Sequence, residues 1–325
     1  MHGVDIETDE VHVDNGEGHL LYVKRMAPRS GAIAGPVLLV PGYGMNSFIL
    51  GFHPTGASLM EHLAGQGLEV FACDLRGQGR TQRTTGSVHY GLADLARTDV
   101  RVLAQTVTER SSVRSPRLGL VGCSMGAALA LGAMCLDPSL QVSALVTIAG
   151  AVTWRSVHPA VRLLFSSSRL AGASPIRGTR RAAEIALPAI AKHAPWLLSP
   201  YLRTETTEMS RAREMTATVE DPHPQINAEI AKWVRNKDLV LDGVNVSQRL
   251  RSFQTPILCV FGNQDGVVPP GTARAHADDM ASTDKTILGI GTKSSPFAHG
   301  DLFVGTGAHH QVFEPIAEFL NTRLR

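Results

Sequence analysis

The sequence lacks the features that would place the protein inside a membrane or on nucleic acid. No uninterrupted apolar run approaches the roughly 20 residues that a spanning helix needs, so we expect no stable insertion into a bilayer. The 31 lysines and arginines and 29 acidic residues are spread along 325 residues and leave a net charge of +2, which gives no reason to expect a nucleic-acid partner. The first seven residues lack the basic start and apolar stretch of a secretory signal, so we expect a cytoplasmic protein.

Cysteine is also scarce. The four cysteines, which all lie in apolar segments and show no CxxC spacing, are Cys73, Cys123, Cys135 and Cys259. Thiols in such segments are usually buried and unpaired, and this spacing does not suit a structural metal. We therefore expect free buried thiols, with no metal and no cofactor.

Short apolar runs without polar alternation supply the framework of the chain. Such runs are typical of strands buried on both faces of a parallel sheet. The pattern predicts a hairpin over 11–23 and then strands at 37–40, 70–73, 118–121, 142–148, 257–261 and 286–290. Helical spacing between them, at 58–64, 92–107 and 312–320, predicts an α/β fold with a mostly parallel, doubly wound sheet. Asp99 interrupts the apolar face of the second helix without an evident reason.

About a hundred residues separate the strands at 142–148 and 257–261. This stretch has a helical composition and no convincing core strand, and the connections between successive strands of a sheet are usually much shorter. We therefore expect an inserted helical cap at 153–251 between two parts of a core domain, 1–152 and 252–325. All three tryptophans, Trp154, Trp196 and Trp233, lie in the expected cap.

The strongest local signal is Gly-Cys-Ser-Met-Gly at 122–126, directly after a predicted strand and before a helical run. This G-x-S-x-G pattern holds a serine on a strained turn that needs small neighbours two residues before and after it. The turn exposes the hydroxyl at the carboxyl end of the sheet, next to a helix N-terminus. Ser124 is therefore the predicted nucleophile. Cys123 is a rival by chemistry, but it occupies a variable position and should point away from the site.

A serine nucleophile needs hydrogen-bond donors for the oxyanion, as well as a base and an acid. The glycine-lined turn at 41–45 follows the first buried strand, so we expect the backbone N–H groups of Tyr43 and Met125 to be the oxyanion donors. When the serine lies on such a turn, the three residues follow one another along the chain in the order serine, acid, histidine, and the acid comes after a strand. Asp265 follows the strand at 257–261, whereas the other common acid position, after 142–148, holds no carboxylate. The predicted base is His299, in a loop after the last strand.

Taken together, these segments resemble α/β-hydrolase fold enzymes. The resemblance rests on residues 41–44 (Pro-Gly-Tyr-Gly), 74–79 (Asp-Leu-Arg-Gly-Gln-Gly), 122–126, 262–265 and His299. It covers the chain from about residue 10 to the end, except the cap, and implies an architectural role for Asp74. The tail at 299–316 is similar to acid lipases. The stretch 37–80 is similar to polyhydroxyalkanoate synthases, which carry cysteine where this chain has Ser124.

The expected activity is hydrolysis of a carboxylic ester with a hydrophobic acyl or alcohol group, through an acyl-enzyme on Ser124. Trp154 is the tryptophan expected to line the substrate cleft, because it follows a strand end by only a few residues. The alternative is an acyltransferase or thioesterase that acts on a carrier-bound acyl group. Six arginines and no acidic residue lie between 155 and 181, so this stretch is either a solvated basic face or a site that recognises a phosphate-bearing acyl carrier or an anionic substrate. A second copy of the chain also stays open as a partner.

Overall fold

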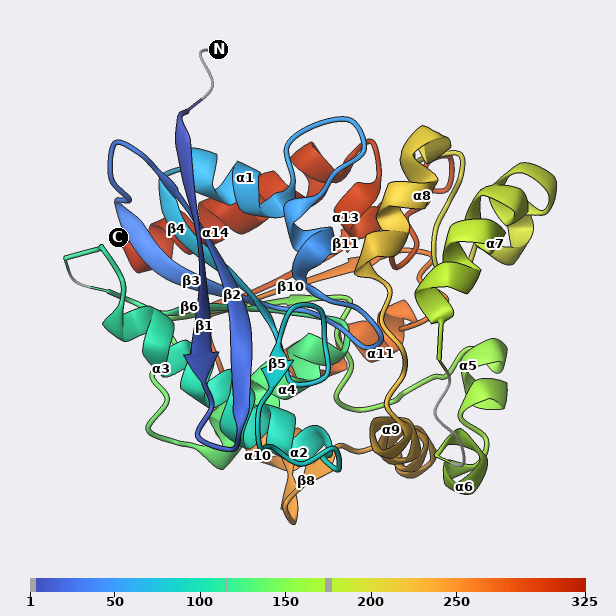
Figure 1. Ribbon diagram of the computed structural model, residues 1–325, viewed down its shortest axis with the longest axis horizontal. Coiled ribbons are helices and arrows are strands. Elements are labelled where there is room, and N and C mark those ends of the chain that lie inside the picture. The colour runs from blue at the N-terminus through green and yellow to red at the C-terminus, as the bar shows by residue number, and fades with distance from the viewer. Residues whose placement is uncertain (1–3, 115, 173–176) are drawn as a thin grey trace.

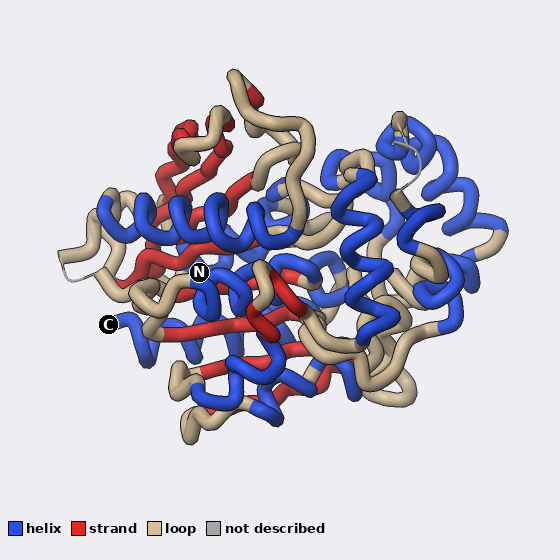
Figure 2. The backbone as a smooth tube through the Cα atoms, turned by 90° about the horizontal axis from the view of Figure 1, so that it is seen from below, coloured by secondary structure: helices blue, strands red, loops and turns tan. Residues whose placement is uncertain are grey.

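A central sheet with helices on both faces forms the body of the molecule in the computed structural model, which describes residues 4–114, 116–172 and 177–325 (Figures 1 and 2). The strand order is β1-β2-β4-β3-β6-β7-β10-β11, and β5 pairs with β2. The strands are β1 (Ile6–Asp14), β2 (His19–Pro28), β3 (Ala34–Val40), β4 (Leu68–Asp74), β5 (Gln82–Arg83), β6 (Gly119–Cys123), β7 (Ala144–Ile148), β10 (Ile257–Gly262) and β11 (Lys285–Ile290). All pairings from β4 to β11 are parallel, whereas β1 and β2 add an antiparallel edge.

The parallel strands form where the sequence predicts them. The inner ones bury both faces, whereas β11, which was also expected to be buried on both faces, lies at the edge of the sheet and is buried only at Ile290. Every residue of β3, β4, β6, β7 and β10 is buried. The predicted hairpin is confirmed, but it extends beyond the expected range of 11–23. Its strands β1 and β2 pair from Ile6 opposite Pro28 to Asp14 opposite Leu20. The fold is therefore the expected α/β class with a mostly parallel, doubly wound sheet.

Two apolar layers flank the sheet. One face packs against α1 (Leu59–Gly65) and α14 (Glu314–Leu324), and the other against α3 (Arg101–Glu109) and α4 (Met125–Leu136). The remaining core elements are η1 (Ser47–Gly51), α2 (Leu92–Asp94), the π-helical turn η2 (Leu95–Val100), α11 (Pro270–Ala273), α12 (Ala275–Asp279), α13 (Asp301–Val304) and the π-helical turn η7 (His309–Phe313). The helix predicted over 92–107 is thus interrupted by a π-turn, which contains Asp99.

The residues between β7 and β10 form short helices and one small hairpin. They comprise α5 (Pro159–Leu164), α6 (Ser168–Ala171), α7 (Thr179–His193), η3 (Pro195–Leu197), η4 (Met209–Arg211), α8 (Ala212–Met215), η5 (Thr216–Thr218), α9 (Pro224–Asn236), β8 (Val240–Leu241), β9 (Val244–Asn245), α10 (Val246–Arg249) and η6 (Leu250–Ser252). We call residues 153–251 the cap segment; its limits as a separate domain stay a prediction. Figures 1 and 2 place α5 to α7 at one end of the molecule, beyond the strands.

Part of the cap segment is anchored in the core. Trp154, Ile230, Trp233 and Leu250 are buried in the same apolar cluster as the sheet and α4. The indole of Trp233 donates a 2.8 Å hydrogen bond to the backbone carbonyl of Val152 and meets Trp154 edge to face. The helices α9 and α10 are therefore fixed on the core. None of the helices described is long and apolar enough to cross a membrane.

Candidate active site

Ser124 stands at the turn between β6 and α4 in a backbone conformation that side chains rarely adopt. Its φ is +54° and its ψ is −119°. The turn is tight, because a Cβ on Gly122 would lie 2.4 Å from the Cα of Ala127 and one on Gly126 would lie 2.3 Å from the carbonyl oxygen of Val40. Only glycine fits at these two positions, as the G-x-S-x-G pattern predicts. The Ser124 side chain is partly exposed at the end of the sheet, next to the first turn of α4.

His299 and Asp265 meet in two loops at the same edge of the sheet. His299 Nδ1 lies 2.7 Å from Asp265 Oδ2, and both side chains are buried. Because a carboxylate only accepts hydrogen bonds, Nδ1 carries the proton and Nε2 of the neutral ring is left as an acceptor. The other carboxylate oxygen of Asp265 accepts 2.8 Å hydrogen bonds from the backbone N–H groups of Val267 and Val268. The acid is therefore held by its own loop as well as by the histidine.

Ser124 and His299 both line a cavity of about 280 Å³. The predicted residues Tyr43, Met125 and Trp154 line it as well. Its other walls are apolar or aromatic side chains from β-strand ends and the cap segment, namely Met45, Ala151, Val161, Leu164, Phe165, Tyr201, Ile230, Trp233, Val267 and Val268. Apart from His299, no described residue in this lining can carry a charge near neutral pH. The cavity thus offers a largely apolar space beside one hydroxyl and one imidazole.

The loop that carries Tyr43 is held by the cap segment. The Tyr43 hydroxyl donates a 2.5 Å hydrogen bond to the side-chain oxygen of Asn227, a buried residue of α9. The next residues pair with the chain before α9: Glu220 N–H donates to the Gly44 carbonyl at 2.8 Å, and Met45 forms an antiparallel bridge with Val219. Met125, the other predicted donor, is the first residue of α4, where the backbone N–H has no acceptor within the helix.

A second part of the cap segment, residues 200–207, holds the loops of Asp265 and His299. Gly266 N–H donates to the Pro200 carbonyl at 2.9 Å, and Gly300 N–H donates to the Tyr201 carbonyl at 2.6 Å. The buried carboxylate of Asp301 accepts hydrogen bonds from the backbone of Ala298 and Arg203 and from the Thr207 hydroxyl. Asp301 and Asn227 were not predicted, because Arg203 and Thr207, which bind Asp301, and Tyr43, which binds Asn227, are remote in sequence. A carboxylate two residues after the predicted base was the one signal available.

Cys123 and the other histidines that follow Asp265 in the sequence lie elsewhere. Cys123 is fully buried, and burial raises the pKa of its thiol. His276 is buried in α12 against the Thr147 hydroxyl, whereas His309 contacts the Ala57 carbonyl and His310 pairs with Glu314 on the surface. Asp74 accepts hydrogen bonds from the backbone N–H groups of Ser47 and Arg80, which fits the predicted architectural role.

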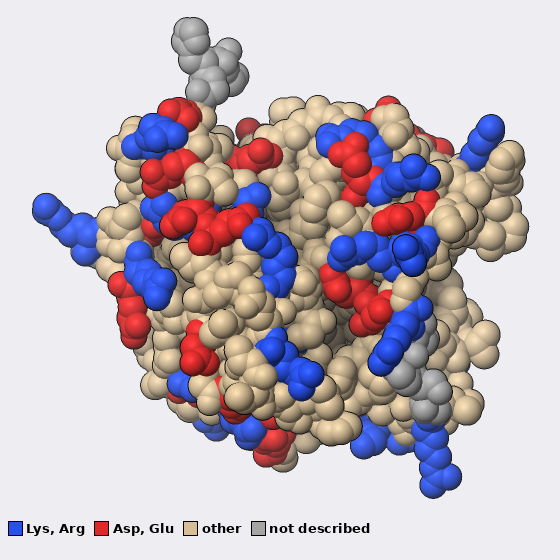
Figure 3. All heavy atoms as spheres, in the orientation of Figure 1, with Lys and Arg blue, Asp and Glu red and all other residues tan. Residues whose placement is uncertain are grey.

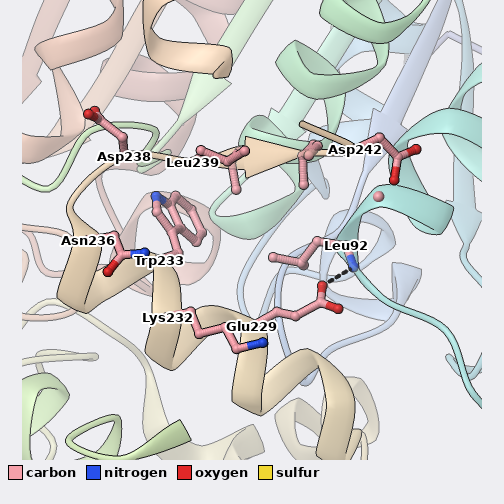
Figure 4. Close-up of a pocket in the computed structure, with 11 residues that line it drawn as sticks. Leu92, Glu229, Lys232, Trp233, Asn236, Asp238, Leu239 and Asp242 are labelled. Carbon is pink, nitrogen blue, oxygen red and sulfur yellow. Dashed lines mark hydrogen bonds between the residues drawn. The ribbon is translucent and has the colours of Figure 1, made fainter. Parts of the chain in front are cut away.

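The four cysteines are all buried free thiols, as expected. Among the residues that the structure describes, no three histidine, cysteine or acidic side chains are grouped so that they could hold a metal ion. Trp233 joins Trp154 in the cavity wall, while Trp196 is 70% exposed. Trp233 also borders a second cavity of about 340 Å³, between α9 and the β8–β9 hairpin, which is lined by several charged residues (Figure 4).

Residues 31–290 match the Hydrolase_4 family, described as "Serine aminopeptidase, S33". Since the match covers most of the chain, this protein belongs to that family of α/β-hydrolases. No curated protein sequence matches the chain.

Solved structures similar to the chain include esterases and lipases with the same fold. A soluble variant of monoglyceride lipase from Saccharomyces cerevisiae is 16% identical with a TM-score of 0.65, and the match covers 100% of this chain and 97% of that one. An esterase from Exiguobacterium antarcticum is 16% identical with a TM-score of 0.62, covering 96% and 100%. The thioesterase domain from the curacin biosynthetic pathway is 17% identical with a TM-score of 0.58, covering 97% and 99%. At these identities the likeness establishes the α/β-hydrolase fold, and the family match makes the chain a hydrolase.

Proposed function

We propose that this hydrolase cleaves carboxylic esters with a hydrophobic acyl or alcohol group, through an acyl-enzyme on Ser124. The observation that carries the proposal is the shared apolar cavity, which is lined both by a strained serine and by a histidine that is hydrogen-bonded to a buried carboxylate. A serine hydroxyl with a neutral imidazole acceptor and an oriented acid is the arrangement that acyl transfer requires.

In the proposed mechanism His299 Nε2 takes the Ser124 proton as the oxygen attacks the acyl carbonyl. The backbone N–H groups of Tyr43 and Met125 stabilise the oxyanion that forms. The intermediate collapses when the imidazolium of His299, stabilised by Asp265, returns the proton to the leaving alcohol. Water then enters, His299 removes its proton, and attack on the acyl-enzyme releases the carboxylic acid and restores Ser124.

The lining of the cavity favours esters over peptides. An aminopeptidase must bind the ammonium group of its substrate, and burying that charge without an acidic partner is costly. The described lining offers no carboxylate. A thioester is the second candidate, favoured by the thioesterase domain among the similar structures and by the chemistry of acyl transfer, which is common to both.

The proposal is tested by labelling and by a substrate panel. A fluorophosphonate probe should label Ser124 in the wild type, should not label the folded Ser124→Ala variant, and should still label Cys123→Ala. Turnover of p-nitrophenyl esters should fall by about four to six orders of magnitude in Ser124→Ala and His299→Ala, and little in His309→Ala.

The panel compares p-nitrophenyl esters of increasing acyl length with acyl-thioesters and aminoacyl-p-nitroanilides. We expect the highest kcat/KM among the esters. A clear preference for thioesters would favour the second candidate, and a preference for the anilides would overturn the ester assignment. Labelling at a residue other than Ser124 would overturn the mechanism.

A further inference from the structure

Exposed apolar side chains are concentrated on the cap segment. Among the described residues, eleven large apolar side chains are exposed, and seven of them fall between 163 and 201. The seven, which we call the apolar rim, are Leu163, Leu164, Leu170, Ile185, Trp196, Leu197 and Tyr201. Single exposed apolar residues are ordinary, but a concentration of this kind on one part of a protein marks an interaction surface.

The apolar rim lies on α5, α6, α7 and the chain around η3, which occupy one side of the molecule in two perpendicular views (Figures 1 and 2). It is continuous with the cavity of Ser124, because Leu164 and Tyr201 belong to both. Leu164 is 66% exposed and Tyr201 is 46% exposed, yet each also lines the cavity. The apolar surface therefore extends from the cavity wall to the outside of the protein.

The stretch of chain that carries the apolar rim has an excess of basic residues. Between residues 155 and 201 the only acidic residue is Glu184. The exposed basic residues of α5 to α7 and the chain between them are Arg162, Arg169, Arg177, Arg180, Arg181 and Lys192. Of these, Arg180 pairs with Glu220 at 2.7 Å. At the outer edge of this side, Figure 3 shows lysine or arginine side chains projecting at the upper and lower ends with uncharged surface between them, while acidic and basic side chains alternate further inward. A mixture of exposed leucine, tryptophan and arginine is complementary to a lipid surface with anionic headgroups.

We propose that the apolar rim adsorbs to the surface of a bilayer that contains anionic lipid, so that the mouth of the cavity faces the acyl chains. The leucines and Trp196 enter the interface, while the arginines contact the headgroups. The proposal that the protein binds a bilayer depends only on the apolar rim and the arginines around it. The proposal that an acyl ester reaches Ser124 from the bilayer rests on the proposed function.

Tryptophan fluorescence gives a direct test, because Trp154 and Trp233 are 5% and 6% exposed and Trp196 is 70% exposed. The Ser124→Ala protein, which cannot consume lipid, is mixed with phosphatidylcholine vesicles with and without phosphatidylglycerol. We expect the emission to shift to the blue with the anionic vesicles, and we expect no shift in the additional variant Trp196→Phe. The shift should weaken as the salt concentration rises.

Co-sedimentation with the same vesicles measures the strength of binding. Leu163→Ser should weaken it about tenfold, and Arg169→Gln about fivefold. The matched controls are Val240→Ser, an exposed apolar residue on β8 that Figure 1 shows apart from α5 to α7, and Arg251→Gln, an exposed arginine of η6. Neither control should change binding.

Absence of sedimentation with anionic vesicles, or equal loss in the controls, would overturn the proposal. So would a dimer in sedimentation velocity that Leu163→Ser dissociates, because the surface would then serve a second copy of the chain. Turnover of a water-soluble p-nitrophenyl ester by the wild type and Leu163→Ser is measured in parallel. Failure of vesicle binding with intact turnover rejects the lipid surface alone, whereas loss of turnover in the wild type rejects the proposed function.

Discussion

The position of Asp99 shows how one residue can contradict a sequence pattern for a structural reason. The π-turn η2 places its carboxylate inside the protein, where it accepts hydrogen bonds from the Arg76 side chain and backbone and from Asn15. The side chains of Asp99 and Arg76 are almost completely inaccessible to water. This pair ties the loop after β4 to the helix and to the hairpin, and explains the charged residue that interrupts an otherwise apolar helix face.

Removing one partner of this buried pair should be costly. Asp99→Ala leaves the Arg76 guanidinium buried without its main partner, so we expect the free energy of unfolding to fall by about 3–5 kcal/mol. Asp5→Ala, which breaks an exposed ion pair with Arg29, should cost less than about 1 kcal/mol. Urea denaturation measures both. Equal, small losses would mean that the buried pair contributes nothing beyond its surface counterpart.

The side chain of Tyr43 is hydrogen-bonded to the cap segment, and the backbone N–H of the same residue is a proposed oxyanion donor. Tyr43→Phe leaves the backbone N–H in place but removes the hydrogen bond to Asn227, so the loop loses a restraint and a buried amide loses its partner. We expect kcat to fall about three- to tenfold with little change in KM. Asn227→Leu should behave like Tyr43→Phe, while Asn227→Asp, which keeps the acceptor, should retain more of the activity. A change in KM alone would assign the bond to substrate binding instead.

Among the elements of the fold, the sequence predicts those that are buried and show a short repeating pattern of apolar residues. It does not predict those that depend on contacts between distant parts of the chain. The inner parallel strands were predictable because both of their faces are apolar. The turn at Ser124, the loop of Asp265 and the loop of His299 were predictable because each follows such a strand. The pairing of 44–46 with 218–220 was not, because more than 170 residues separate the partners, as in the bond from Asn46 to the Ala217 carbonyl. The π-turns were also missed, because they follow from tertiary packing around residues such as Asp99.

The wall that the cap segment adds to the cavity should set the preferred acyl length. Trp154 packs edge to face against Trp233 beside the cavity, so Trp154→Ala opens space next to Ser124. We expect the optimum in a p-nitrophenyl ester series to move to longer acyl chains while fluorophosphonate labelling of Ser124 persists. The control Trp196→Ala, at an exposed position, should leave the series unchanged for soluble esters. An unchanged optimum in a folded Trp154→Ala protein would place the selectivity elsewhere.

The stability of the whole molecule should depend on pH through buried histidines. Burial lowers the pKa of His53 and His62, and lowers that of His276 to about 4. The unfolded chain binds a proton at such a residue near pH 6.5, whereas folded His276 stays neutral until about pH 4. The unfolded state therefore binds more protons in this window, and stability is full above about pH 7 and falls as the pH drops from about 6.5 towards 4.

The low pKa of His276 should reduce the free energy of unfolding by about 2 kcal/mol between pH 7 and pH 5. Urea unfolding at the two pH values measures the total loss. His276→Gln, which cannot be protonated, should be less sensitive to the same change of pH by about that amount. If the variant and the wild type show the same pH dependence, His276 does not contribute.

The contacts of residues 200–227 have a consequence for how this protein can be altered. Their backbone meets the loops of Asp265 and His299 at Pro200 and Tyr201, and the loop of Tyr43 from Thr218 to Glu220. The side chain of Asn227 adds the hydrogen bond to the Tyr43 hydroxyl. The described residues of 155–195, in contrast, supply cavity wall and outer surface. A chimera that exchanges only this first stretch with a relative would import a new selectivity and keep the native scaffold of the reacting groups. A crossover placed beyond residue 200 would replace that scaffold too. Substitutions between relatives should therefore be better tolerated at 155–195 than at 200–227 of the cap segment.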